Sequence, residues 1–536
     1  MLQPESELPT HRVENQPVPA APRDPWADDP TLRAHLDAAG GMAPPLAALG
    51  ATIAETDSWA LGRLAREVPP RLAPFDRSGR RLDEVQFHPA YHELMRMGLE
   101  AGYAGGPWTG RGGGRHATHA AMVYLMTQVE PGVCCPMTMT YAAVPAINAE
   151  PTLAAAWRTR LTAAAYDPAI LPVGAKRAAT MGMAMTEKQG GSDVRANTTR
   201  AEPEGDSWRL TGHKWFCSAP MSDGFLTLAQ APGGLTCFVV PRWLEGGRNG
   251  IRLMRLKDKM GNHANASAEI EYDGALAHRL GPEGEGVRTI IEMVHHTRLD
   301  TAMAPAGLMR AALTEALWWV EGRRTFQRRL IDQPLMRAVL ADLVLDWEGA
   351  LALGLRVAAA FDDHAQRPFA RIGVALAKFL SNKRCPVVVG EAMECLGGTG
   401  YIEESGMPML YREAPLNGIW EGAGNVICLD ILRTLARDPA AAAALQAELD
   451  SASGASRGYD HALHTLRTRW PGEVPEAEAR AFAEATAHLL TASVLLRRAP
   501  DPVGEAYVAA RLGHRGLIPG AVTGLPVVAL LARLSG

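Results

Sequence analysis

The chain has 536 residues, of which 47% are hydrophobic, and its 54 Lys and Arg residues stand against 58 Asp and Glu residues, a formal net charge of −4. This length exceeds the usual size of one hydrophobic core, so we expect several domains. The charge balance excludes a protein coated in basic surface and by itself predicts no nucleic-acid partner, although a local basic patch is compatible with it.

The seven cysteines are odd in number and show no Cys-x-x-Cys or Cys/His metal spacing. They predict reduced thiols in a cytoplasmic protein and no metal site. The first residues lack the cationic start and apolar segment of a secretory signal. The longest uncharged apolar run, residues 517–532, is broken by prolines and glycines and is too short to span a bilayer, so we expect no membrane contact.

Residues 1–40 predict an N-terminal arm, because the prolines from Pro17 to Pro30 prevent a continuous helix. A disordered tail is the alternative. Helical periodicity then predicts a helical N-terminal domain over residues 41–181. Its expected helices cover residues 42–55, 58–67, 91–101, 119–130 and 153–165. The Gly-rich segment 105–115 lacks the Gly-Lys-Ser/Thr ending of a phosphate loop and predicts a flexible surface loop.

A period of two follows and predicts a small antiparallel β-barrel domain over residues 182–282. Its expected strands cover residues 208–211, 225–230, 235–240, 251–256 and 268–272. Long helical patterns predict a helical-bundle domain over residues 283–438, with helices at 287–326, 334–363, 369–396 and 417–435. Residues 439–536 predict an extra C-terminal helical domain. The expected fold class is therefore α+β, mainly α.

One Gly-rich stretch, Thr186-Glu-Lys-Gln-Gly-Gly-Ser-Asp193, has the composition of a cofactor cradle. Gly190 and Gly191 let backbone N–H groups approach a ligand closely, and Ser192 adds a hydroxyl beside them. The same residues also fit an ordinary Gly-Gly turn capped by Ser192 and Asp193, so local chemistry leaves both interpretations open.

Three motifs in order resemble the acyl-CoA dehydrogenase superfamily: Thr186-Glu187 with Gly191-Ser-Asp193, then Gly212-His-Lys214 to Ser218, then Ile419-Trp-Glu-Gly422. The stretches 183–193, 256–261 and 420–425 are similar to one branch of that superfamily, the adaptive-response flavoproteins called AidB. The resemblance runs from His11 to the final helices. It implies the acyl-CoA dehydrogenase fold, bound FAD and a homotetramer in which the N-terminal extension helps to join subunits.

The resemblance also implies a set of FAD-binding residues: Met185, Thr186, Gly191, Ser192, Phe216, Ser218, Arg323 from a neighbouring subunit, Gln333, Gly397, Gly398, Trp420, Gly422 and Asn425. Two positions depart from the superfamily pattern. Phe216 replaces the usual ring-stacking Trp, as in the AidB branch, and Ala423 replaces a hydroxyl residue, which costs one flavin hydrogen bond.

Glu421 matches the superfamily's catalytic base, which abstracts a proton α to a thioester and needs a carboxylate in a dry site. By local chemistry alone it is equally a helix N-terminal carboxylate. Arg298 matches the family arginine near that carboxylate, with an electrostatic role. Asp300 is a secondary candidate base, although a solvated helix residue is the simpler interpretation.

Two functions from different classes follow from the resemblance. The first is an FAD-dependent protein of the DNA alkylation response that retains weak dehydrogenase activity on short or branched, isovaleryl-CoA-like thioesters and binds double-stranded DNA through its C-terminal domain. From Pro439 on, nine Arg residues face nine acids, and Arg497, Arg498, Arg511 and Arg515 could gather into a basic face. Surface salt-bridging explains the same residues. The alternative is a metabolic acyl-CoA dehydrogenase that passes electrons to an electron-transfer acceptor and binds no DNA.

Overall fold

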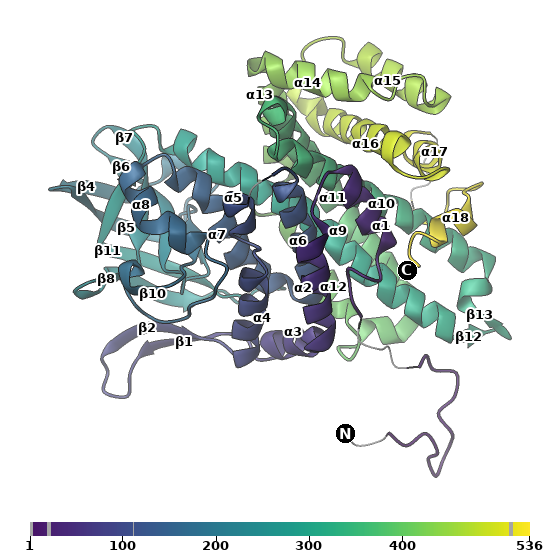
Figure 1. Ribbon diagram of the computed structural model, residues 1–536, viewed down its shortest axis with the longest axis horizontal. Helices are drawn as coiled ribbons and strands as arrows, with labels where there is room; N and C mark the ends of the chain where they lie inside the picture. The colour runs from purple at the N-terminus through teal and green to yellow at the C-terminus, as the bar shows by residue number, and fades with distance from the viewer. Residues whose placement is uncertain (1–3, 19–22, 111, 514–517, 536) are drawn as a thin grey trace.

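The computed structural model describes residues 4–18, 23–110, 112–513 and 518–535. Figure 1 shows a strand-rich region at one end of the molecule and a larger helical body at the other. The 37-residue helix α9 (Gly286–Gly322) starts against strand β7 and continues through the helical body, so one element connects the two regions. Within the described residues no helix is long and apolar enough to cross a membrane.

The N-terminal region is helical, as expected, and includes one hairpin that the sequence did not reveal. Its helices are α1 (Pro30–Ala38), α2 (Ala43–Glu55), α3 (Ser58–Glu67), α4 (Pro89–Glu100), α5 (Gly106–Thr109), α6 (Arg115–Val129), α7 (Pro131–Ile147) and α8 (Pro151–Leu161). Strands β1 (Arg71–Phe75) and β2 (Arg81–Gln86) form the hairpin. Asp83 accepts a hydrogen bond from the backbone N–H of Leu253, so tertiary contact with the β-domain stabilises the hairpin.

The Gly-rich segment 105–115 is more ordered than predicted. Helix α5 occupies part of it, and the Trp108 indole donates to the Tyr141 carbonyl at 3.0 Å and stacks on the Tyr141 ring with centroids 5.4 Å apart. The prediction of a flexible surface loop is therefore wrong for this part of the segment, because a large aromatic side chain anchors it.

Residues 15–18 of the N-terminal segment dock on the end of α9, whereas residues 4–14 are exposed. The Asn15 side chain donates to the Arg324 carbonyl at 2.8 Å and accepts from the Arg324 N–H at 2.7 Å, while the Trp318 indole donates to the Val18 carbonyl at 2.8 Å. These bonds hold residues 15–18 against α9, so this part of the segment is an ordered arm.

The β-domain is closed into a barrel-like ring. Its strands are β3 (Met181–Ala184), β4 (Arg200–Glu204), β5 (Ser207–Ser218), β6 (Gly224–Ala231), β7 (Gly234–Pro241), β8 (Trp243–Leu244), β9 (Gly247–Arg248), β10 (Ile251–Leu256) and β11 (Ser267–Leu280). Because β11 pairs with both β7 and β5, the strands β11, β7, β6, β3 and β5 close on themselves. Most pairs are antiparallel, as predicted, but β6 runs parallel to β3 and β4.

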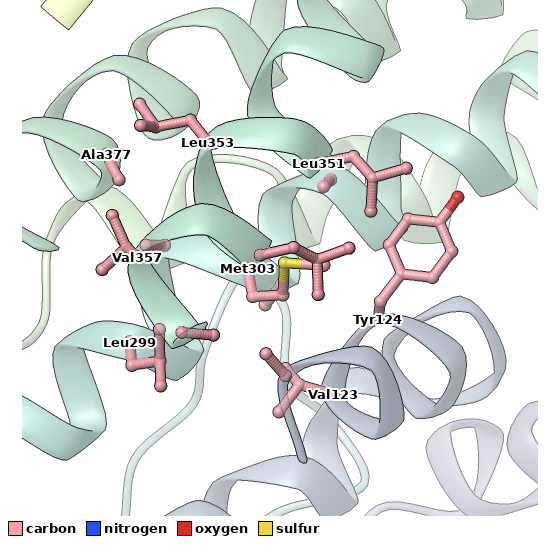
Figure 2. Close-up of a cluster of buried hydrophobic side chains, with 14 of the residues drawn as sticks. Val123, Tyr124, Leu299, Met303, Leu351, Leu353, Val357 and Ala377 are labelled. Atoms are coloured by element: carbon pink, nitrogen blue, oxygen red, sulfur yellow. The ribbon is translucent and has the colours of Figure 1, made fainter. Parts of the chain in front are cut away.

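The bundle consists of α9, α10 (Pro334–Phe361), α11 (Arg367–Cys395) and α13 (Gly424–Arg437), with α12 (Met407–Glu413) before α13. The short strands β12 (Arg324–Thr325) and β13 (Arg328–Arg329) connect α9 to α10. Figure 2 shows part of the core, where α6, α9, α10 and α11 contribute Val123, Tyr124, Leu299, Met303, Leu351, Leu353, Val357 and Ala377. Leu299 and Ala377 are the sequence neighbours of Arg298 and Lys378, so this packing fixes both charged residues.

The C-terminal region is helical, with α14 (Pro439–Asp450), α15 (Arg457–Arg469), α16 (Ala479–Arg498), α17 (Val503–Tyr507) and α18 (Val527–Leu531). It lies against the bundle in Figure 1. Buried ion pairs join the two: Arg356 of α10 binds Glu448 of α14 at 2.6 Å, and Arg511 binds Asp346 of α10 at 2.9 Å.

Candidate active site

One buried ion pair joins the two segments that predicted a cofactor cradle. Lys214 of β5 donates to Glu187 Oε1 at 2.8 Å, and both side chains are 0% exposed. Glu187 also accepts from the Thr199 hydroxyl at 2.7 Å and the Thr198 N–H at 2.7 Å. Burial would raise the pKa of Glu187, but Lys214 and these donors outweigh it and lower the pKa to about 2. The Glu187 turn therefore has a fixed position beside β5.

The Gly-Gly turn presents its backbone to open space. A Cβ at Gly190 would meet no atom within 4 Å, whereas one at Gly191 would collide with the Thr186 side chain. Gly190 has a φ of +150°, which an L side chain rarely adopts, and Ser192 is exposed. The Gly190 N–H already donates to the Glu187 carbonyl at 3.0 Å, so the features that fit the pyrophosphate of FAD are the open space beside Gly190 and the exposed Ser192 hydroxyl.

A β-bulge directs Phe216 away from the barrel interior. Between the pairs Ala268↔Cys217 and Ile270↔Lys214 the register shifts, so β5 carries one extra residue there. Lys214 and Cys217 are buried as a result, while Phe216 is 44% exposed. An exposed aromatic ring two residues before Ser218 fits a flat cofactor, as expected for these positions.

Glu421 lies in a strained loop rather than in a helix. Residues 419–423 separate a 3₁₀ turn (Leu416–Gly418) from α13, and Glu421 has a φ of +58°. A bulky residue in this region costs energy and is found where the surrounding structure enforces it. The expected helix 417–435 therefore starts late, and the interpretation of Glu421 as a helix N-terminal carboxylate is wrong.

Two buried cations hold the Glu421 loop. Arg298 of α9 donates through Nε to the Glu421 carbonyl at 3.2 Å and through Nη1 to Asp430 at 2.7 Å. Lys378 of α11 donates through Nζ to the carbonyl oxygens of Asn417 at 2.9 Å and Gly422 at 3.0 Å. The bonds enforce the conformation that the loop's own residues do not favour.

The surroundings of the Glu421 carboxyl shift its pKa in opposite directions. Burial raises the pKa of Glu421 above its ordinary value, and the Thr297 hydroxyl, Lys378 and Arg298 oppose this rise. The sequence indicated Glu421 and Arg298 but missed Lys378. Its one signal is a lone cation in the apolar stretch Val374-Ala-Leu-Ala-Lys-Phe-Leu380.

The Cys135 thiol of α7 links Glu421 to the cofactor segments. Burial raises the pKa of Cys135 to about 12, Glu421 adds to the rise, and hydrogen bonding with Asn265 and Ser218 opposes it. Cys135 therefore lies near both Ser218, at the end of β5, and Glu421. That position suits its expected place at the mouth of a substrate site.

Asp300 is not a solvated helix residue. It is buried, and its carboxylate receives hydrogen bonds from the Thr138 hydroxyl at 2.5 Å and from His119, whose Nε2 lies 2.7 Å away. These partners occupy both carboxylate oxygens, so the geometry favours a structural role and leaves Glu421 as the better base.

Other expected cofactor residues lie outside this cluster. Gln333 donates to the Thr325 hydroxyl at 2.8 Å, and Arg323 donates to the Asn15 carbonyl at 2.9 Å. Both lie beside β12 and β13, far from the β-domain of the same chain in Figure 1. The remaining expected positions are Met185, whose carbonyl accepts from Asn197; Trp420, which donates to Asn417; Asn425, which accepts from Arg480; Gly397 and Gly398, which begin a 3₁₀ helix; and Gly422, which lies in the Glu421 loop.

The expected basic face of the C-terminal domain does not form as predicted. Arg511 is 6% exposed and binds Asp342 and Asp346, and Arg497 binds Glu448 at 2.5 Å. Arg498 donates to the Ala38 carbonyl at 3.0 Å, and Arg515 lies outside the described residues. The physical reason is neutralisation by buried acids, which come from α10 of the bundle for Arg511 and from α14 of the same C-terminal region for Arg497.

Three family models match the chain. Residues 15–168 match the N-terminal domain of adaptive response protein AidB, residues 182–275 the acyl-CoA dehydrogenase middle domain and residues 284–436 the acyl-CoA dehydrogenase C-terminal domain. The putative acyl-CoA dehydrogenase AidB of Escherichia coli (strain K12) is 43% identical over 516 residues, 95% of each chain.

Solved structures agree on the fold. Caenorhabditis elegans ACDH-11, in complex with C11-CoA, superposes with a TM-score of 0.85 at 27% identity over 96% of this chain and 95% of that one. An acyl-CoA dehydrogenase from Bacillus anthracis complexed with FAD has a TM-score of 0.62 at 18% identity, covering 78% of this chain and 77% of that one.

The cradle, the barrel and the bundle define an FAD-dependent oxidoreductase that acts on CH–CH groups. Across almost its whole length the chain belongs to the AidB group of the acyl-CoA dehydrogenase family.

Proposed function

We propose that the protein catalyses the α,β-dehydrogenation of a short or branched acyl-CoA thioester, with Glu421 as the base. The observation that carries the proposal is the Glu421 loop: a carboxylate at a φ of +58°, held through backbone carbonyls by Arg298 and Lys378 and raised in pKa by burial. A carboxylate with a raised pKa suits abstraction of a weakly acidic α-proton.

The chain's own residues would perform the proton step. Glu421 takes the α-proton on its carboxylate, while Arg298 and Lys378 hold the backbone of the Glu421 loop in position. Thr186, Gly191, Ser192, Phe216 and Ser218 would hold FAD at the end of β5. When bound, FAD supplies the acceptor for the β-hydrogen, which leaves with its electron pair as the double bond forms. The Cys135 segment would shield the site from water.

We further propose a homotetramer in which Arg323 reaches the FAD of a neighbouring subunit. A guanidinium suits a pyrophosphate. Two large apolar side chains beside it support an interface: Phe326 is 92% exposed and Leu335 is 84% exposed. Phe326 lies between β12 and β13, and Figure 1 shows this pair of strands at the end of the molecule opposite the barrel, where the proposed second copy would dock.

The test of the base is Glu421→Gln, with Glu404→Gln as the matched control, since Glu404 is exposed. We expect the Glu421 variant to bind FAD normally and to lose bleaching of the flavin by every member of a panel from butyryl-CoA to lauroyl-CoA, isovaleryl-CoA included. The control should bleach like the wild type. Unchanged bleaching in Glu421→Gln would remove this residue from the base role.

A role in the DNA alkylation response is the second candidate, supported by the similarity to Escherichia coli AidB over 95% of the chain. It is tested by titrating the purified flavoprotein with duplex DNA at two salt concentrations, because phosphate contacts weaken steeply with salt. Salt-sensitive binding favours this role, and bleaching by an acyl-CoA without DNA binding favours a metabolic dehydrogenase that passes electrons to a separate acceptor.

A further inference from the structure

Lys378 is a buried cation at the centre of the bundle that the reaction scheme above uses only as a support. It is 1% exposed and lies on α11 between core residues, with Ala377 on one side and Phe379 on the other. Within the described residues it forms no ion pair within 4.0 Å. A buried ammonium without a directly bonded carboxylate is costly, so its retention calls for a reason beyond packing.

Its hydrogen bonds point to that reason. The Nζ donates to the carbonyl oxygens of Asn417 and Gly422, which lie on either side of Glu421 in the sequence. The bond to Gly422 acts on the peptide immediately after the strained Glu421 residue. With Arg298 on the Glu421 carbonyl, the carbonyls of residues 417, 421 and 422 are all held by buried cations.

We propose that Lys378 is a positioning residue that holds the Glu421 carboxylate in place and keeps it ionised for proton abstraction. The inference rests on the proposed function, because it concerns the same base. It adds a residue on a different element whose charge sets the working pH range of the site.

The charges around Lys378 define how this works. Burial lowers the pKa of Lys378 to about 7; Glu421 opposes this, while Arg298 of α9 and Lys383 of α11 itself add to it. Asp430 of α13 is engaged by Arg298 and Arg371 instead. Below neutral pH Lys378 is therefore charged and stabilises ionised Glu421. As the pH rises through about 7 the ammonium is lost, and with it one cation that favours the carboxylate and one hydrogen-bond donor to the loop.

The test compares Lys378→Met, which removes the charge and the donors, with Lys378→Arg, which keeps a charge that does not titrate. Glu421 ionisation is followed in protein without acyl-CoA by the infrared band of its protonated carboxyl, assigned with Glu421→Gln. We expect the pKa of Glu421 to rise by roughly one unit in Lys378→Met and to return most of the way in Lys378→Arg. Flavin bleaching at pH 7 should slow about tenfold in Lys378→Met, with acyl-CoA affinity changed less than about twofold.

Lys176→Met is the control, because it removes another buried lysine, which binds Asp223 at 2.5 Å and has no contact with the Glu421 loop. It should lower stability without moving the Glu421 titration. An unchanged Glu421 titration and an unchanged pH profile in Lys378→Met would overturn the inference. If Glu421→Gln itself bleached normally, the proposed function would fail instead, so the two failures are distinct.

Discussion

The buried pair Glu187–Lys214 allows a sharp test of how the cofactor segments are held together. Glu187→Gln keeps the shape of the side chain and one acceptor oxygen, but it removes the negative charge that compensates the buried Lys214 ammonium, whose other acceptor is the uncharged Leu228 carbonyl at 2.8 Å. Removing one partner of a buried pair costs about 3–5 kcal/mol, because the other charge is left uncompensated.

The lowered pKa of Glu187, which the same Lys214 contact causes, gives a figure of the same order. It falls from 4.5 to about 2 in the folded protein, and a difference of this size corresponds to about 3 kcal/mol of stability. Because the folded pKa is depressed, this contribution is fully present above pH 4.5 and is lost as the pH falls from 4.5 towards 2. The wild-type protein should therefore lose this part of its stability in acid, and Glu187→Gln should not.

The assay is urea unfolding of the apoprotein at pH 7 and at pH 4, followed by tryptophan fluorescence, with FAD content measured on the holoprotein. Glu202→Gln, an exposed residue of β4, is the matched control. Glu187→Gln should be destabilised by about 3–5 kcal/mol at pH 7 and should bind FAD more weakly. A double-mutant cycle with Lys214→Met should show strong coupling. Strictly additive effects, or a Glu187→Gln protein within about 1 kcal/mol of the wild type, would refute the reasoning.

Two further predictions concern the cradle and the C-terminal arginines. Gly191→Ala places a Cβ against the Thr186 side chain and should weaken FAD binding about tenfold in a flavin titration, whereas Gly246→Ala, where nothing lies within 4 Å, should leave affinity unchanged. Arg511→Gln leaves Asp346 buried without one of its cations and should destabilise the protein by about 3–5 kcal/mol in thermal unfolding. A loss of duplex binding by Arg511→Gln with normal stability would contradict the buried position.

The sequence predicted the elements that repeat a pattern over many residues. The helix 58–67 and the strand 251–256 have the expected bounds, and the long helices of the bundle start within two residues of the expected positions, except for the last. Helical periodicity continues through residues 417–423, but Arg298 of α9 and Lys378 of α11 bond carbonyls of this loop in a non-helical conformation. These contacts come from distant parts of the chain, so no local sequence pattern predicts them.

The candidate site also contains residues that the sequence predicted and residues that it did not. Motifs located Glu421, Arg298, Thr186 and Gly191, because these positions are carried in short segments. The sequence did not indicate Lys378, because its hydrogen-bond partners lie 39 and 44 residues further along the chain. A lone lysine in an apolar helix also has many explanations. The sequence also did not predict the exposure of Phe216. That exposure depends on a bulge opposite Glu269, which the alternation of residues along β5 alone does not reveal.

The C-terminal arginines show why counting charges could not settle the question of a DNA surface. Residues 439–536 contain nine arginines and nine acidic residues, so the segment is neutral overall. Two of these arginines, Arg511 and Arg533, nevertheless form ion pairs with acids of α10, outside the segment. Arg467 and Arg469 pair instead with neighbours inside it. To bind a phosphate, Arg511 would have to leave two buried carboxylates. The free-energy cost of leaving them exceeds what several surface contacts with phosphates could offset. Any DNA surface on this domain must therefore use the arginines that the bundle leaves exposed.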